Sequence, residues 1–118
     1  MPIPISEQQQ LQRSMNVITQ SKLISSGIDP LRARRIVNVF KAYCQDDTAI
    51  LCRILELAGF GILTPGEQRS FEGKVHWLVE GTSVRTVELG ELDSMTDNCV
   101  QLVHELNAEY DGWYTEID

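Results

Sequence analysis

The segment from Arg35 to Tyr43 carries apolar side chains on both of the faces that an extended chain presents. It is rich in β-branched and aromatic residues, and alternation places Val37 and Val39 on one face and Ile36 and Phe40 on the other. Apolar residues on both faces are typical of strands that lie inside a sheet. The segment therefore predicts a central strand.

A long helix is expected before this strand, over residues 6–26. Ser6 is a candidate N-cap, and Gly27, with a proline close behind it, is a candidate end signal. Three apolar residues at i, i+4 and i+7 predict an amphipathic helix whose buried stripe consists of Leu11, Met15 and Ile18.

Two further helices are expected after the strand. The first opens at Asp46 or Asp47 and ends at Gly59, and the second opens at Asp93 or Ser94. Each has a broad apolar stripe that predicts burial on one side. The stripes are Ile50, Leu51, Ile54, Leu55 and Ala58 in the first helix, and Met95, Cys99, Leu102, Val103 and Leu106 in the second.

Three more extended segments complete the pattern. The first is a short strand over residues 60–63, which runs into Thr64-Pro65-Gly66, a sequence that favours a type II turn. The second, Lys74 to Glu80, alternates clearly and is closed by Gly81. The third is the extended, aromatic segment from Ala108 to Ile117.

This order of elements predicts an α+β protein with a ferredoxin-like β-α-β-β-α-β sandwich and an additional N-terminal helix. We expect a single domain over residues 1–118, with the helix at 6–26 and the ferredoxin-like unit at 33–118. In such a unit two helices cover one face of an antiparallel sheet. The other face is left to solvent, to the additional helix or to a partner, so we expect function there.

The charge of the chain is negative and unevenly distributed. The net charge is −7, yet residues 1–45 carry six basic and two acidic residues, including Arg32, Arg34 and Arg35. A net negative chain is repelled by the phosphate backbone, so direct nucleic-acid binding is disfavoured. We interpret the three arginines as side chains that pair with acidic neighbours, and an RNA-binding module built on them is the alternative.

The sequence contains no recognisable catalytic or metal-binding motif. Cys44, Cys52 and Cys99 lack the CxxC spacing of a zinc site, and His76 and His104 have no second ligand at metal-site spacing. Gly59-Phe60-Gly61 precedes a strand, whereas a dinucleotide fingerprint follows one. We therefore expect a protein that is no enzyme and that uses no cofactor and no metal.

Neither a membrane span nor a secretion signal is recognisable in the sequence. The longest apolar stretch, residues 49–63, is interrupted by Arg53 and Glu56 and is shorter than the roughly 20 residues that a bilayer requires. The first residues turn polar at Ser6 without a charged n-region and an apolar h-region. We expect a cytoplasmic protein that does not engage a membrane.

The terminal strand combines aromatic side chains with a glycine that a strand normally avoids. In a regular strand Tyr110, Gly112 and Tyr114 share one side, while the other side is formed by Asp111, Trp113, Thr115 and Ile117. One interpretation is that the aromatics pack under the helices. The other is that one aromatic stands on the open face as a binding anchor, and both can hold because the two sides differ.

The sequence Glu109-Tyr110-Asp111-Gly112-Trp113 in this strand resembles a signature of the regulator of ribonuclease E activity B family. The resemblance implies a ferredoxin-like fold and a protein that binds ribonuclease E, or a related RNA-decay enzyme, and inhibits it without cutting RNA. Candidate protein-binding residues are Tyr110, Asp111, Trp113 and Tyr114. The alternative function is a small-ligand sensor, which rests on analogy between folds.

Overall fold

The computed structural model describes residues 4–116, apart from the side chain of Phe71. Over these residues the chain forms three helices and four strands. In chain order they are α1 (Ile5–Ser25), β1 (Arg34–Ala42), α2 (Gln45–Leu57), β2 (Gly61–Phe71), β3 (Lys74–Arg85), α3 (Leu89–Val103) and β4 (Ala108–Thr115).

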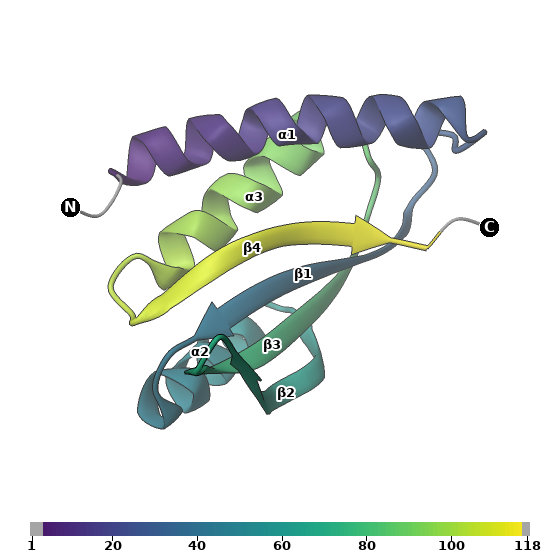
Figure 1. Cartoon of the computed structure of the whole chain (residues 1–118). Coiled ribbons are helices and arrows are strands. Elements are labelled where there is room, and N and C mark those ends of the chain that lie inside the picture. Colours follow the sequence, from purple (N-terminus) through teal and green to yellow (C-terminus); the bar gives the residue numbers. More distant parts are fainter. Residues whose placement is uncertain (1–3, 117–118) are drawn as a thin grey trace.

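The four strands form one antiparallel sheet in the order β2-β3-β1-β4. The strand predicted to be central, β1, pairs with β3 on one side and with β4 on the other. Helices α2 and α3 pack on the same face of the sheet (Figure 1). The predicted ferredoxin-like α+β architecture, with one additional helix at the N-terminus, is confirmed.

The apolar core lies between this sheet face and the two helices. Its fully buried members include Ile36 and Phe40 from β1, Leu55 from α2, and Met95 and Cys99 from α3. Their positions match the apolar stripes that the sequence predicts for the strand and for the second and third helices. The alternate residues of β1 therefore point to the opposite face, which no helix of the ferredoxin-like unit covers.

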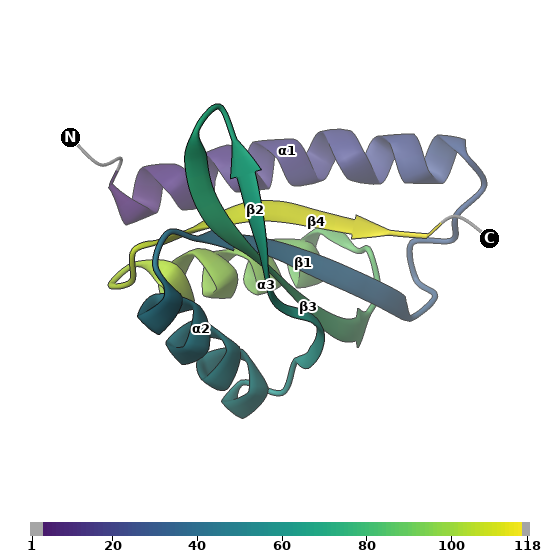
Figure 2. The ribbon, with the colours of Figure 1, turned by 60° about the horizontal axis from the view of Figure 1, so that its bottom comes forward.

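The helix α1 packs against α3 and runs along β4 (Figures 1 and 2). Its predicted buried stripe is wrong, because Leu11, Met15 and Ile18 are 55%, 58% and 57% exposed. The buried side of the helix is instead largely polar. Its hydrogen bonds to α3 and to the chain just before α3 come from Gln9, Arg13, Asn16 and Gln20.

The ends of α1 agree with the prediction within one residue, although its N-cap does not. The helix begins after Pro4, without the side-chain cap expected from Ser6. At the other end the Ile28 N–H bonds to the Leu23 carbonyl, and Gly27 adopts a φ of 92°. This is the glycine-terminated end that the sequence predicts, and it also brings two apolar side chains, Leu23 and Ile28, into the core.

The starts of α2 and α3 differ from the prediction. The N-cap of α2 is Cys44, whose Sγ accepts from the Asp47 N–H, while the Asp47 carboxylate accepts from the Asn107 N–H. Helix α3 begins at Leu89, several residues before the expected Asp93 or Ser94. A glycine in the first turn, at position 90, obscures this start in the sequence.

The strand β2 is longer than predicted. It continues through Pro65 and Gly66, and the expected type II turn is replaced by register shifts on both sides of Pro65. A proline fits here because β2 is an edge strand, where a missing N–H is tolerated. The hairpin turn lies instead at Glu72 and Gly73, which both have positive φ, and Figure 2 shows the hairpin projecting from the sheet. The strand β3 is also longer than predicted, because it passes through Gly81, where closure was expected, and ends at Arg85.

Among residues 4–116, no helix combines the length and the apolar character that crossing a membrane would require.

Candidate protein-binding site

A bulge in β4 decides which way each residue of the terminal strand points. Tyr110 pairs with Phe40, and Trp113 pairs with Asn38, so two residues of β4 lie opposite Val39 alone. One of the two is Gly112, whose φ of 96° is readily adopted only by glycine. The extra residue reverses the alternation, so the sides predicted for a regular strand are wrong.

With this reversal, Tyr110 and Trp113 both point toward the helices, whereas Asp111 and Tyr114 point to the open face of the sheet. The prediction had placed Tyr110 with Tyr114, and Asp111 with Trp113. Ile117, which was assigned to one of these sides, lies outside the residues that the structure describes. The bulge therefore separates the four candidate residues into an inner pair and an outer pair.

The inner residue Tyr110 secures β4 to the core. Its ring centroid lies 5.2 Å from that of Phe40, and its hydroxyl donates to Asn38 Oδ1 at 2.7 Å. Burial of this hydroxyl, with Cys99 beside it, raises the pKa of Tyr110 far above the ordinary tyrosine range. The phenol is therefore an uncharged hydrogen-bond donor inside the fold.

The second inner residue, Trp113, connects β4 to α1. Its Nε1 donates to Asn16 Oδ1 at 2.9 Å, and Asn16 is completely buried. The Asn16 side-chain amide in turn donates to Asp93 Oδ1 at 3.1 Å and to Thr96 Oγ1 at 3.0 Å on α3. This one asparagine therefore joins α1, α3 and β4, a role that the hydrophobic pattern of the sequence does not reveal.

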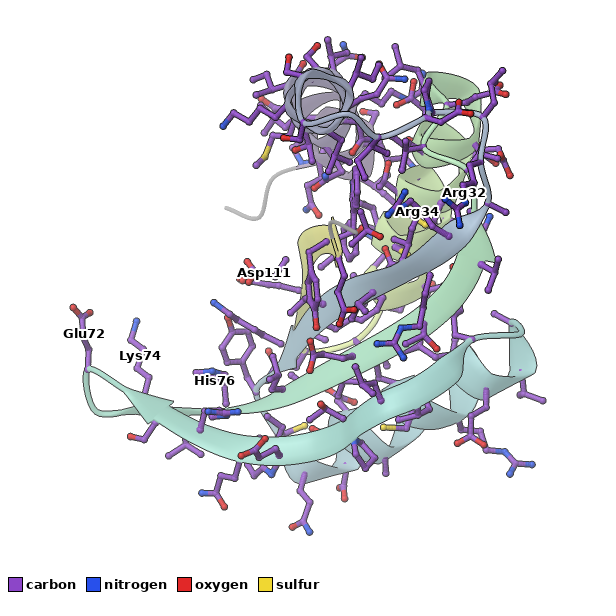
Figure 3. All side chains as sticks on the ribbon, turned by 90° about the vertical axis from the view of Figure 1, so that its right-hand side faces the viewer. Arg32, Arg34, Glu72, Lys74, His76 and Asp111 are labelled. Atoms are coloured by element: carbon purple, nitrogen blue, oxygen red, sulfur yellow. The ribbon has the colours of Figure 1, made fainter. Side chains whose placement is uncertain are left out.

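The outer pair stands on the open face among charged neighbours. Asp111 Oδ2 lies 3.7 Å from Lys41 Nζ of β1. Figure 3 shows Asp111 projecting on the concave side of the curved sheet, the side on which Lys74 and His76 of the hairpin also lie. This carboxylate is exposed and only loosely paired, so it is available to a partner.

Tyr114 is 43% exposed, and its hydroxyl donates to Glu80 Oε2 at 2.8 Å. Because Glu80 belongs to β3, the tyrosine side chain reaches across β1, and Val37 beneath it is only 3% exposed. The hydrogen bond to the Glu80 carboxylate raises the pKa of Tyr114. Thr64 also donates to Glu80, at 2.7 Å. These contacts hold an aromatic ring in a fixed position on the open face.

The rest of this face was not singled out as a site in the sequence, although its alternation is recognisable there. Pairing between β1 and β3 places Val39 beside Glu80 and Lys41 beside Leu78. Val39 and Leu78 are half-buried. The open face therefore combines apolar strips, an aromatic ring and charged side chains, which is the composition of a protein-binding surface.

The three arginines of the basic segment lie at the end of β1 near the C-terminal end of β4. Arg34 donates to the Thr115 hydroxyl at 3.3 Å and to the Glu116 carbonyl at 2.9 Å, and Arg35 lies 3.7 Å from the Glu116 carboxylate. Arg32 is exposed nearby, as Figure 3 shows. The contacts of Arg34 and Arg35 agree with the interpretation that these side chains pair with neighbours rather than form an RNA-binding patch.

A depression of about 130 Å³ lies between Arg34, Arg35, Val37, Thr115 and Glu116. Small-molecule sites usually occupy roughly 300 to 1,000 Å³. The depression is thus small for the ligand-sensor alternative.

The cysteines and histidines occupy separate places. Cys44 caps α2, and burial raises the pKa of Cys99 to about 12 and that of Cys52 by less. Within residues 4–116, no three His, Cys, Asp or Glu side chains gather in an arrangement that could hold a metal ion.

Comparison with known proteins adds one finding. The family model described as Regulator of ribonuclease activity B matches residues 14–115. The matched region runs from within α1 to the end of β4 and includes all four candidate residues. A search of curated proteins returned no match.

Proposed function

Because the chain belongs to the Regulator of ribonuclease activity B family, we propose that it binds ribonuclease E and inhibits it without cutting RNA itself. The observation that carries this proposal is the family match over residues 14–115, which covers nearly the whole fold. The Glu109-to-Trp113 sequence lies within this match and forms the bulge of β4.

We place the binding site on the open face of the sheet, with Tyr114 as its aromatic anchor and Asp111 as its charged contact. Tyrosine is among the side chains that contribute most to protein interfaces, because it offers a large ring and a hydroxyl at low entropic cost. Tyr114 is exposed and already oriented by Glu80, so little conformational freedom is lost on binding.

Tyr110 and Trp113 have an indirect role in this proposal. Both side chains are engaged inside the fold, by Asn38 and Asn16 respectively. Their contribution is to fix the bulge that turns Asp111 and Tyr114 outward. Substituting either inner residue would alter binding through the position of the strand.

The charge of the chain supports a protein partner over RNA. Residues 86–116 contain eight acidic residues and neither lysine nor arginine. The acidic residues are Glu88, Glu91, Asp93, Asp97, Glu105, Glu109, Asp111 and Glu116. This surface repels phosphates and attracts a basic protein segment.

The test is a titration of the purified chain into a cleavage reaction of ribonuclease E with a fluorescently labelled RNA. We expect the cleavage rate to fall to a saturating minimum, while the chain alone leaves the RNA intact and does not bind it in a gel-shift assay. An unchanged cleavage rate, with no complex detected by calorimetry, would refute the proposal. Cleavage of the RNA by the chain alone would refute its non-catalytic part.

A further inference from the structure

The helix α1 presents an apolar stripe to solvent. Leu11, Met15 and Ile18 are spaced i, i+4 and i+7, and each is more than half exposed. An amphipathic helix normally turns such a stripe toward the core. Here the inward side is occupied by the polar residues that bond to α3 and β4, so the apolar stripe has no partner within the described fold.

The position of the stripe follows from helix geometry, in which successive residues are about 100° apart. Relative to Asn16, the α3-bonded residues Arg13 and Gln20 lie to one side, about 40° to 60° away. Met15 lies on the other side, about 100° away, and Leu11 and Ile18 lie a further 40° to 60° in the same direction.

The partly covered residues between Asn16 and this stripe, Gln8, Gln12 and Thr19, lie on the side away from α3. Because Asn16 contacts Trp113 of β4 as well as α3, β4 is the neighbour on that side. The stripe of Leu11, Met15 and Ile18 therefore flanks β4, and beyond β4 lies the open sheet face with Tyr114.

The charges beside the stripe are mainly acidic. Glu7 lies one turn before Leu11 on the same side of α1, and β4 contributes Glu109 and Asp111 to the open face. Lys41 is the basic side chain that contacts this part of β4, through Asp111. An apolar wall bordered by carboxylates complements a segment that is apolar on one side and basic on the other.

We propose that the α1 stripe and the neighbouring open face form one docking surface for a basic amphipathic helix of a partner protein. The inference deepens the proposed function, on which it rests for the identity of the natural partner. The apolar side of the partner helix packs on Leu11, Met15, Ile18 and Tyr114, and its basic side chains approach Glu7, Glu109 and Asp111. A basic helix fits this surface better than RNA, which would bring phosphates to the carboxylates.

The test uses a designed peptide of about 18 residues, roughly 27 Å long as a helix, with leucines along one side and lysines elsewhere. Two comparison peptides have glutamates in place of the lysines, or the same residues in scrambled order. We expect the basic peptide to bind the full chain with a micromolar Kd and to weaken with salt, and both comparison peptides to bind at least about tenfold more weakly.

The stripe is tested by the triple variant Leu11→Gln, Met15→Gln and Ile18→Gln, which keeps the charge and good helix formers. The matched control is Val17→Gln with Ile24→Gln, since these residues are 50% and 45% exposed on the α3 side of α1. Circular dichroism checks that both proteins fold. We expect the triple variant to lose about tenfold in affinity for the basic peptide and the control to change less than about twofold.

Equal affinities of the triple variant and the control would overturn the docking surface, as would equal binding of the basic and acidic peptides. A wild-type dimer that dissociates in the triple variant would also overturn it, because a second copy would then cover the stripe. Parallel measurements with ribonuclease E separate the two proposals. Binding of ribonuclease E but not of the peptide would refute only the docking surface, and the reverse result would refute only the proposed function.

Discussion

Replacing Asn16 by alanine tests whether a polar contact holds α1 in place. The wild-type side chain is fully buried and bonds to Trp113, Thr96 and Asp93. In Asn16→Ala the Trp113 Nε1–H loses its acceptor, and a buried donor without a partner costs about 1 to 3 kcal/mol. Thr96 retains a weak bond to the Asp93 carbonyl, so it adds little to the loss.

The bond to the Asp93 carboxylate adds to this loss, because hydrogen bonds to charged groups contribute about 1.5 to 3 kcal/mol. Asp93 is only half-buried, and water recovers part of that contribution. We therefore expect Asn16→Ala to lower the free energy of unfolding by about 2 to 4 kcal/mol. For a domain of this size the midpoint of thermal unfolding falls by roughly 8 to 20 °C.

The assay is urea and thermal unfolding, followed by circular dichroism and by tryptophan fluorescence. Val17→Ala is the control, because Val17 is exposed on the adjacent position of the same helix, and its effect should stay within about 0.5 kcal/mol. If Asn16→Ala loses no more than this control, then α1 is held by something other than its polar contacts, and the reasoning is wrong.

Three further predictions concern the bulge, the core and the response to pH. Gly112→Ala should destabilise by about 1 to 3 kcal/mol, because it forces an L side chain to a φ of 96°, whereas Gly90→Ala in the first turn of α3 should be neutral or stabilising; equal effects in urea unfolding would contradict the strained bulge. Leu55→Ala should cost about 2 to 5 kcal/mol and Leu57→Ala less than about 0.5, since Leu55 is 0% and Leu57 is 77% exposed, and a small loss at Leu55 would mean that the core is assigned to the wrong side of α2. Because the folded-state pKa of Cys99 is raised to about 12, its contribution to stability is present below the unfolded pKa of about 9 and is lost as pH rises toward 12; a Cys99→Ala protein should show a weaker decline over that range, and identical pH profiles would exclude this role.

The sheet and the two helices on it could be predicted because their patterns are set by the core. Apolar residues at positions 36 and 40 and at 51 and 55 are buried where the alternation of a strand and the periodicity of a helix place them. The order of these elements then restricts the topology, since consecutive strands joined through helices favour few arrangements.

The side of α1 that is buried could not be predicted, because periodicity assumes that apolar residues pack inward. Asn16 reverses this assumption through partners 77 to 97 residues away in the sequence. A single sequence carries no pattern for such a long-range polar contact. The outward stripe is consequently a feature that only the structure reveals.

The orientation of the terminal strand was also beyond the sequence, although the glycine that causes it was recognised. Gly112 indicated that a bulge was possible, but whether the strand includes one depends on its register with β1. One extra residue moved Trp113 inward and Tyr114 to the open side. The four candidate residues were thus found by their resemblance, and their division into two roles required the pairing of the strands.

The most direct test of the account is the affinity of ribonuclease E for the wild-type chain and for Tyr114→Ala, with Leu57→Ala on the opposite layer as the control. We expect the wild type and the control to bind equally, and Tyr114→Ala to lose about tenfold or more while remaining folded. Full affinity in a folded Tyr114→Ala protein would contradict the claim that the open face is the binding site. Absence of binding by the wild type would contradict the proposed function itself.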